Sequence, residues 1–408
     1  MAESENDKLA GRVAFTYPDF RRYQYARFFI TVALEMQSVA VGWQIYDVTR
    51  QPLDLGLAGL AQFLPGVLLF LVSGNIVDRF ERRRLLAICY SGFAVCSALL
   101  LEISWRGTRS VSAIYAVLVL VGIVRSLNGP VSRAILPQLV NEEHFPNAIA
   151  WHSTIFQAAT ILGPTVGGLA YAFFRGAAGV YVLATITAVA AVLSTMRIET
   201  KGKARPREPV NWDTVMAGLR YIWERKLILG VISLDLFAVL LGGAVALLPV
   251  YARDILRTGP WGLGLLRTAP GIGASATAIL LAHRPLRGKI GAAMLWCVAG
   301  FGLFTIVFGL SHNLILSMVA LLLVGATDMV SVVVRAILVQ LATPDEVRGR
   351  VNAVEMIFIG ASNEFGQFES GVTASWFGTV PAVVIGGIGA LVVTVLWALG
   401  FPELRRAE

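Results

Sequence analysis

Long apolar runs alternate with short polar connections along almost the whole chain. An α-helix needs about 20 apolar residues to cross the hydrocarbon core of a bilayer. Runs of that length lie near 28–46, 55–77, 85–103, 111–131, 148–173, 177–196, 227–250, 262–282, 291–310, 314–334, 352–375 and 380–401. The pattern predicts an all-α polytopic membrane protein with twelve transmembrane helices.

The polar connections predict how these helices are oriented. Cytoplasmic loops of membrane proteins carry an excess of Lys and Arg. If both termini are cytoplasmic, the outer loops carry only six of the 34 Lys and Arg residues, namely Arg50, Arg106, Arg109, Arg175, Arg253 and Arg257. The first 25 residues show no cleavable signal pattern. We therefore expect a multi-pass protein of the bacterial inner membrane with both termini in the cytoplasm.

The longest polar connection divides the predicted helices into two groups of six. It begins at Arg197 and includes the sequence KGKARPREP, which cannot form a packed core and is typical of a linker. Residues 212–225 are predicted to form an amphipathic helix at the membrane surface. The expected domains are a six-helix bundle at 1–196, a cytoplasmic linker with a surface helix at 197–226, and a second bundle at 227–408.

An internal repeat supports this division. The sequence RAILPQL at 133–139 matches RAILVQL at 335–341, and the pair Pro65-Gly66 corresponds to Pro270-Gly271. Because each half contains an even number of predicted helices, both copies cross the membrane in the same direction. The sequence thus predicts a parallel repeat of two six-helix bundles.

Composition excludes several classes of protein. A chain that is 56% hydrophobic, with a mean hydropathy of +0.69, is too apolar for a soluble domain of this size. The net charge of +8 does not indicate a nucleic-acid partner, because the basic residues follow alternate loops and form no stripe with interleaved aromatics. The three Cys and four His residues lack metal-ligand spacing. We expect no metal, no cofactor and, since no nucleophile and base pair emerges, no enzymatic activity.

The segment GNIVDRFERRRLL at 74–86 is a charged turn between the second and third apolar runs. Its charges cannot lie in hydrocarbon, which places the turn at the cytoplasmic face. Its candidate functional residues are Gly74, Asp78, Arg79, Arg82 and Arg83. They follow the pattern G-x-x-x-D-R-x-x-R-R, which resembles the hinge loop between helices 2 and 3 of the major facilitator superfamily. Glu81 stands where that family usually has glycine. The charges alone favour an ordinary positively charged cytoplasmic loop, and only the further motif matches favour the hinge loop.

The fifth apolar run contains a second motif. Gly163, Pro164, Gly167 and Gly168 resemble the G-P-x-x-G-G pattern that is associated in this superfamily with exporters of the antiporter type. Pro164 removes a backbone donor and bends the helix, and the glycines allow a neighbouring helix to approach closely. Simple packing of small residues is the alternative interpretation.

Ionisable residues inside apolar runs are costly in a membrane and are functional candidates by default. The candidates for proton coupling or for a polar cavity are Glu35, Arg125, Asp235, Asp328 and Glu364. Arg125 resembles the R-x-x-x-G pattern that the superfamily links to proton handling, and Glu35 matches it in depth. The resemblance implies that both residues line the central cavity.

Other charged residues are predicted to brace the structure. These are Arg133, Arg335, Glu355 and Glu369, with Glu355 the first candidate. Glu355, Ser362 and Glu369 share one helical face because they are seven residues apart, whereas Glu364 points nearly the opposite way.

Four aromatic residues leave two interpretations open. Phe29, Trp43, Phe237 and Trp296 line an apolar cavity or face lipid. A cavity of this kind favours bulky, partly apolar solutes.

The segments 363–371 and 377–381 are similar to the bacterial enterobactin-exporter-like branch of the superfamily, which includes siderophore and drug exporters. The resemblance implies a monomeric, proton-coupled exporter of small, partly apolar molecules that works by alternating access in the lipid bilayer. A lipid or lysolipid flippase of the same fold, and a non-transporting membrane receptor or scaffold, remain alternatives.

Overall fold

The structure, a computed structural model, describes residues 12–69, 76–77, 79–107, 110–199, 212–284, 286 and 288–407. These residues form helices joined by short connections, and the described part of the chain contains no strand. Ten helices are long and apolar enough to cross a membrane. Two further helices complete a set consistent with twelve spans: α3 (Pro52–Leu68), which is apolar but short, and α15 (Asp345–Phe377), which is long but rich in charged residues.

The described residues cluster into two compact units, which are treated separately below. The first unit contains residues 1–41 and 64–210, and the second contains residues 42–63 and 211–408. The last part of α2 and most of α3 therefore pack with the second unit, although they precede the rest of the first unit in sequence.

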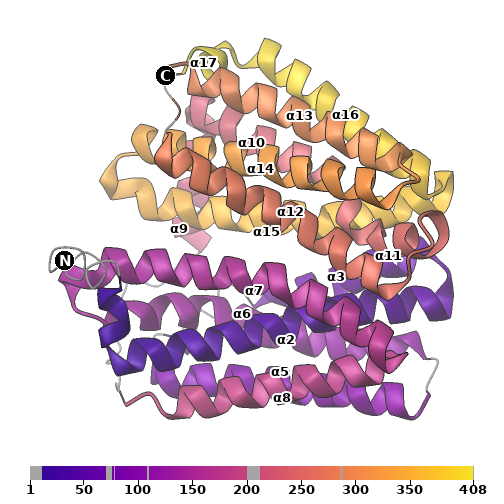
Figure 1. Cartoon of the computed structure of the whole chain (residues 1–408). Helices are drawn as coiled ribbons and strands as arrows, with labels where there is room; N and C mark the ends of the chain where they lie inside the picture. The colour runs from indigo at the N-terminus through magenta and orange to yellow at the C-terminus, as the bar shows by residue number, and fades with distance from the viewer. Residues whose placement is uncertain are drawn as a thin grey trace, which may run out of the picture. The chain divides into compact units, whose positions relative to one another are not determined.

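The first unit is built mainly from five long helices (Figure 1). They are α2 (Pro18–Thr49), α5 (Arg82–Trp105), α6 (Val111–Ile135), α7 (Phe145–Phe174) and α8 (Ala177–Met196), with short helices η1 (Val13–Thr16), η2 (Leu136–Gln138) and η3 (Glu142–His144). Helix α5 packs along both α6 and α8. The face of α8 that is buried carries alanines at 184, 188 and 191, so small side chains let the helices approach closely.

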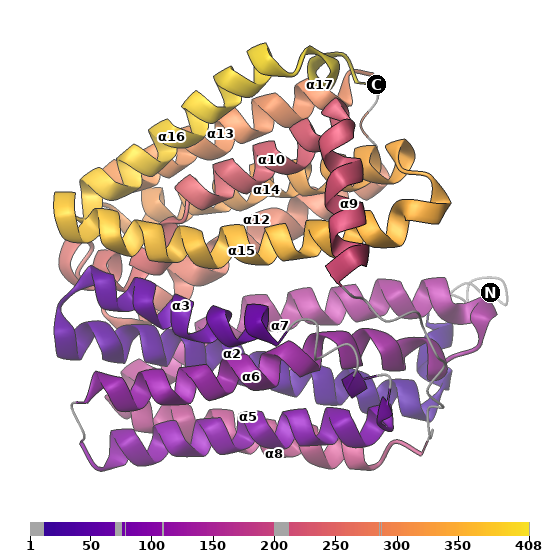
Figure 2. The same ribbon diagram turned by 180° about the vertical axis from the view of Figure 1, so that it is seen from behind.

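The second unit contains the remaining helices, both long and short (Figure 2). They are α9 (Trp212–Glu224), α10 (Lys226–Leu241), η4 (Ala244–Leu247), α11 (Leu248–Val250), η5 (Tyr251–Ile255), α12 (Pro260–His283), α13 (Ile290–Leu310), α14 (Leu314–Ala342), α15, α16 (Thr379–Gly400) and α17 (Pro402–Arg406). Helices α12 and α14 are in backbone contact, because a Cβ atom at Gly325 would lie 2.0 Å from the carbonyl oxygen of Pro270. Helix α13 packs on both α14 and α16.

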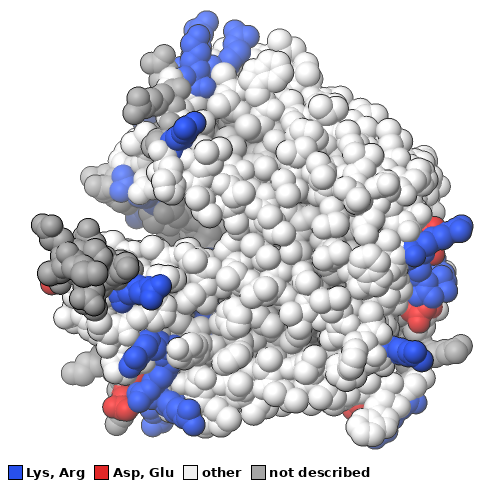
Figure 3. All heavy atoms as spheres, viewed as in Figure 1, with Lys and Arg blue, Asp and Glu red and all other residues white. Residues whose placement is uncertain are grey.

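Charged side chains gather near the helix ends, and uncharged side chains cover the lengths between them (Figure 3). Large apolar residues along these lengths are well exposed, among them Ile186, Trp296 and Val392. Exposed apolar surface of this extent is unfavourable in water and is expected of helices that contact lipid.

Candidate functional site

The second unit contains a buried network of charged side chains that joins three helices. Asp235 on α10 accepts a hydrogen bond from Ser331 on α14, with 3.0 Å between the oxygens. Asp235 also forms an ion pair with Arg335, which lies on α14 like Ser331. The Nε atom of Arg335 lies 3.0 Å from a carboxylate oxygen of Glu355 on α15. Ser331 and Arg335 are one helical turn apart, so both face α10.

The network is enclosed, since Asp235 and Arg335 are each only 5% exposed. A buried charge is tolerated when it is paired and hydrogen-bonded, and it is strongly destabilising when its partner is lost. Arg335 meets this condition because it forms ion pairs with the carboxylates of both Asp235 and Glu355. Arg335 thus contacts acids on two other helices, and the predicted bracing role of Arg335 and Glu355 stays a prediction.

Asp328 lies directly beside this network. It is one turn before Ser331 on α14, and together with Asp235, Thr327 and Phe301 it lines a small cavity between α10, α13 and α14. Among the residues that the structure describes, Asp328 forms no ion pair. Two carboxylates thus face one cavity, and only Asp235 is held by the arginine.

The other two acids of α15 point in different directions, as their spacing predicts. Glu369 accepts a hydrogen bond from Thr373 at 2.7 Å and, with Ser362, lines an apolar groove of about 610 Å³ between α10 and α15. Glu364 accepts a hydrogen bond from Gln367 at 3.2 Å and lies toward α3, where a Cβ atom at Gly59 would be 3.5 Å from its carboxylate.

Equal depth suggested that Glu35 pairs with Arg125, and this pairing stays a prediction. Arg125 is exposed on α6, whereas Glu35 packs against α7, where a Cβ atom at Gly163 would lie 2.4 Å from the Glu35 Cβ. Matching depth fixes only the position along two helices. The rotation of each helix about its axis, set by packing, decides which side chains meet.

The glycine motif of α7 does allow close approach. Gly163, Pro164, Gly167 and Gly168 are all buried, and Pro164 lies inside the helix. A Cβ atom at Gly167 would be 2.8 Å from the Cα of Met36 on α2. Any larger side chain at this position would therefore push α2 and α7 apart.

The charged turn before α5 stabilises the ends of other helices. Gly74 and Asp78 lie outside the described residues, and Arg79 is exposed. Arg82 donates a hydrogen bond to the carbonyl of Ala134 at 2.9 Å, near the end of α6. The last carbonyls of a helix lack partners within the helix and carry partial negative charge, so an arginine there is favourable.

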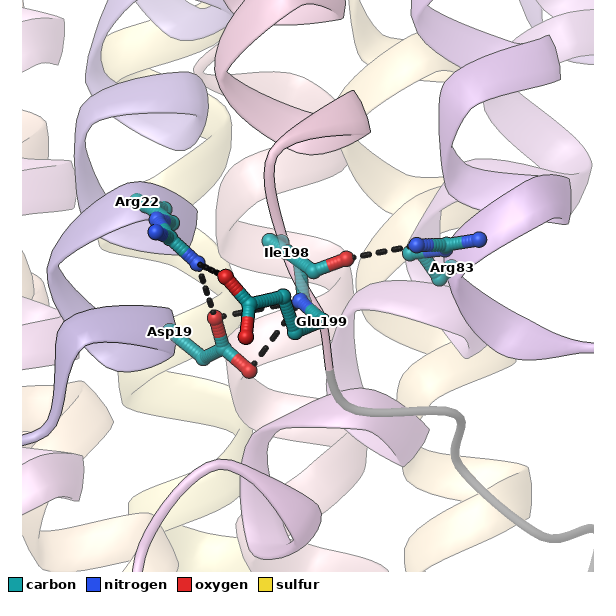
Figure 4. Close-up of polar contacts among 5 residues, drawn as sticks. All are labelled: Asp19, Arg22, Arg83, Ile198 and Glu199. Atoms are coloured by element: carbon teal, nitrogen blue, oxygen red, sulfur yellow. Dashed lines mark hydrogen bonds and ion pairs between the residues drawn. The ribbon is translucent and has the colours of Figure 1, made fainter.

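Arg83 also donates a hydrogen bond to a backbone carbonyl, close to the end of α8. It donates to the carbonyl of Ile198, just beyond the end of that helix, at 2.7 Å (Figure 4). Glu81, which replaces the glycine of the family pattern, precedes the first residue of α5 and pairs with Arg83 at 3.3 Å and with Arg84 at 2.7 Å. The substitution adds a carboxylate at the positive end of α5 and holds the two arginines in place.

The chain that leaves α8 is also fixed to the start of α2. Arg22 pairs with Asp19 at 2.9 Å and with Glu199 at 3.0 Å, and the backbone N–H of Glu199 donates to Asp19 (Figure 4). The first residues of the predicted linker are thereby held against the first unit.

The aromatic candidates divide between the two interpretations. Trp296 is 79% exposed, and Phe237 packs against Trp397 on α16 with ring centroids 5.4 Å apart. Trp43 is buried beneath the guanidinium of Arg253, 5.4 Å from its ring. Exposure of this extent favours lipid contact for Trp296, whereas Trp43 belongs to a polar cluster.

That polar cluster is one that the sequence reasoning missed. Beside Trp43, the hydroxyl of Tyr46 donates to Asp254, Asp47 pairs with Arg253, and Arg50 lies 3.7 Å from Asp254. The sequence offered only charges in two predicted loops, because nothing in the local pattern shows which loops meet.

Membrane-length helices, glycine contacts between them, and ionisable groups buried in their midst define a multi-pass membrane protein of the transporter class. A family model identifies which class of transporter this is. The chain belongs to the major facilitator family described as transmembrane secretion effector, whose model matches residues 14–407.

Two relatives of this chain are named as exporters. The chain is 29% identical over 402 residues to the enterobactin exporter EntS of Shigella boydii serotype 4 (strain Sb227), covering 96% of this chain and 94% of the relative. It is 28% identical over 403 residues to the enterobactin exporter EntS of Escherichia coli O139:H28, with the same coverage of 96% and 94%.

Solved structures of transporters share the fold. A bacterial homolog of the human lysosomal transporter Spinster, inward-facing and unoccupied, aligns with a TM-score of 0.73 at 12% identity, over 95% of this chain and 98% of that one. The nucleoside transporter NupG aligns with a TM-score of 0.68 at 13% identity, over 96% and 100%. The protein is therefore a secondary transporter of small molecules with the major facilitator fold.

Proposed function

We propose that this protein is a proton-coupled exporter that moves small, partly apolar molecules, of siderophore or drug-like character, out of the cytoplasm across the inner membrane as a monomer with both termini inside. The named relatives support export and suggest a siderophore as the cargo. The observation that carries the coupling is the network of Asp235, Arg335 and Glu355 with Asp328 beside it.

The geometry supports a simple coupling step. Asp235 and Asp328 repel each other when both are ionised, and proton uptake by Asp328 relieves that repulsion. Arg335 can then share its charge differently between Asp235 and Glu355, which lie on separate helices. Protonation of Asp328 thus changes how α10, α14 and α15 pack. A two-state transporter requires a proton that interacts differently with its two conformations, and this change in packing would provide that difference.

The test uses purified protein in inside-out vesicles with an acidic interior. We expect uptake of enterobactin, or of ethidium as a drug-like cation, to rise with the imposed pH gradient. Asp328→Asn removes the titratable group and should abolish the gradient-driven component, whereas Asp328→Glu should retain part of it.

Glu102→Gln serves as the surface control, because Glu102 is exposed and, among the described residues, pairs with the exposed Arg106 near the end of α5. It should leave transport unchanged. If Asp328→Asn responds to the gradient as strongly as the unchanged protein, Asp328 does not couple transport to protons. If the unchanged protein shows no gradient-dependent flux of either solute, the proposed function is wrong.

A further inference from the structure

Three basic side chains of the first unit gather near the N-terminal end of α2, where no role has been assigned to them as a group. Arg27 on α2 lies within electrostatic range of Arg133 on α6, and both arginines lie near His152 of α7, whose imidazole is neutral there because burial and the two positive charges disfavour its protonation. We call Arg27, Arg133 and His152 the cationic site. The three residues come from three different helices, so only the folded bundle brings them together.

A tyrosine holds two of these helices in register. The ring of Tyr23 on α2 stacks on the imidazole of His152, with centroids 5.8 Å apart and planes 8° from parallel. The Tyr23 hydroxyl donates to the carbonyl of Ser132 at 2.9 Å, next to Arg133. The site is thus organised in advance of any ligand, which reduces the entropy lost on binding.

Several polar atoms at the cationic site are buried without a partner. They are Nη1 of Arg27, Nδ1 of His152, and both amide atoms of Gln24, one turn from Arg27, whose side chain is 1% exposed. A buried polar atom that is left without a hydrogen bond destabilises the fold. Native proteins keep few of these atoms, so a cluster of them indicates a site whose hydrogen bonds are completed by something that binds there.

No carboxylate of the described chain neutralises Arg27. The nearest acids on α2 are Asp19 and Glu35, each eight residues away, which is about 12 Å along a helix. Asp19 is already engaged by Arg22 and Glu199. The Arg27 guanidinium therefore has no carboxylate counterion among the described residues, which favours a bound anion.

The cationic site is accessible and has an apolar wall. Arg133 is exposed, and the Arg27 guanidinium lies 5.0 Å from the centroid of the Phe156 ring, itself 42% exposed. An arginine beside an open aromatic face suits a ligand that carries a negative group on a planar apolar body, because the guanidinium binds the anion while the ring stacks.

We propose that the cationic site, with Phe156 as its apolar wall, binds the anionic group of an amphipathic aromatic molecule, and that this is the acidic end of the exported substrate. The inference rests on the proposed export function for the identity of the ligand. It adds that the substrate class is organic anions, recognised by the first unit, whereas the carboxylate network lies in the second.

The experiment measures binding of 2-naphthoate and of its neutral amide, 2-naphthamide, to the purified full chain in nanodiscs of phosphatidylcholine. The readouts are ligand-induced thermal stabilisation and tryptophan fluorescence, since Trp151 adjoins His152 in sequence. We expect naphthoate to bind more tightly than naphthamide. Arg27→Gln should weaken naphthoate binding roughly 10- to 100-fold, as loss of a charge-assisted hydrogen bond implies, and leave naphthamide binding unchanged.

Arg106→Gln, which removes an equivalent charge from an exposed position, is the matched control and should change neither affinity. Arg27→Lys keeps the charge without the planar fork and should lie between the unchanged protein and Arg27→Gln. If Arg27→Gln does not fold, Arg27→Lys and Arg133→Gln carry the same test. Equal affinities for the two probes, or an equal loss of both on substitution, overturn the proposal.

A second arm separates a soluble ligand from a lipid headgroup. Adding phosphatidylglycerol to the nanodiscs should leave naphthoate binding intact. If the anionic lipid displaces naphthoate in the unchanged protein but not in Arg27→Gln, the site belongs to the lipid and the substrate assignment is wrong. These measurements need no pH gradient, so failure here leaves the coupling proposal standing, and loss of gradient-driven transport leaves the binding result standing.

Discussion

Replacing Arg335 tests whether the buried network holds the second unit together. The Arg335→Leu variant leaves the carboxylates of Asp235 and Glu355 without their cation. Their side chains are 7% and 15% exposed, so water cannot replace the lost interaction. Removing one member of a buried ion pair costs about 3–5 kcal/mol, mainly because the remaining charge stays buried and unpaired. We expect a loss of that size in the free energy of unfolding.

The measurement is reversible unfolding in mixed micelles titrated with sodium dodecyl sulfate, followed by circular dichroism. Arg106→Leu is the control, because Arg106 and Glu102 form a surface pair with side chains 74% and 54% exposed. An exposed pair contributes less than about 1 kcal/mol. The difference between the two variants therefore isolates burial, since both lose the same type of side chain.

A double substitution sharpens the test. Adding Asp235→Asn to Arg335→Leu removes one of the uncompensated charges, so the double variant should be more stable than Arg335→Leu alone, with a coupling of roughly 1–3 kcal/mol. The reasoning is refuted if Arg335→Leu costs no more than Arg106→Leu, or if the two substitutions in the network add without coupling.

Two further substitutions test the helix contacts of the first unit. Gly163→Ala should lower the free energy of unfolding by about 1–3 kcal/mol, because the new Cβ would clash with Glu35. Gly129→Ala is the control: the space around its Cβ is open, so it should be neutral or slightly stabilising in the same detergent titration. Arg83→Gln should lower the thermal unfolding temperature, because it removes the charged hydrogen bond to the carbonyl of Ile198 just beyond α8, at a cost of about 0.5–1.5 kcal/mol. Arg84→Gln, whose side chain is 74% exposed, should change this temperature less, and equal shifts would contradict a stabilising role for the Arg83 contact.

The local pattern of the chain determined the class of the protein. Runs of membrane length must become helices, because a backbone in lipid has to satisfy its hydrogen bonds within the segment. The glycines of the 163–168 motif could be recognised as contact points for the same reason, since only the absence of a side chain permits backbones to approach. Glu355 could be proposed as a brace because an acid near the end of an apolar run needs a partner, and its ion pair with Arg335 supports that prediction.

Only the tertiary structure decided which charged groups meet. Depth along a helix follows from counting residues, whereas the contact of the Glu35 Cβ with Gly163 depends on how α2 and α7 are rotated about their axes. Arg335 and Asp235 are 100 residues apart in the chain, and Arg27 meets His152 only through the packing of α2 on α7. A sequence states how far each side chain lies along its own helix, whereas side-chain contacts depend on how the helices turn and pack, which is a property of the whole bundle.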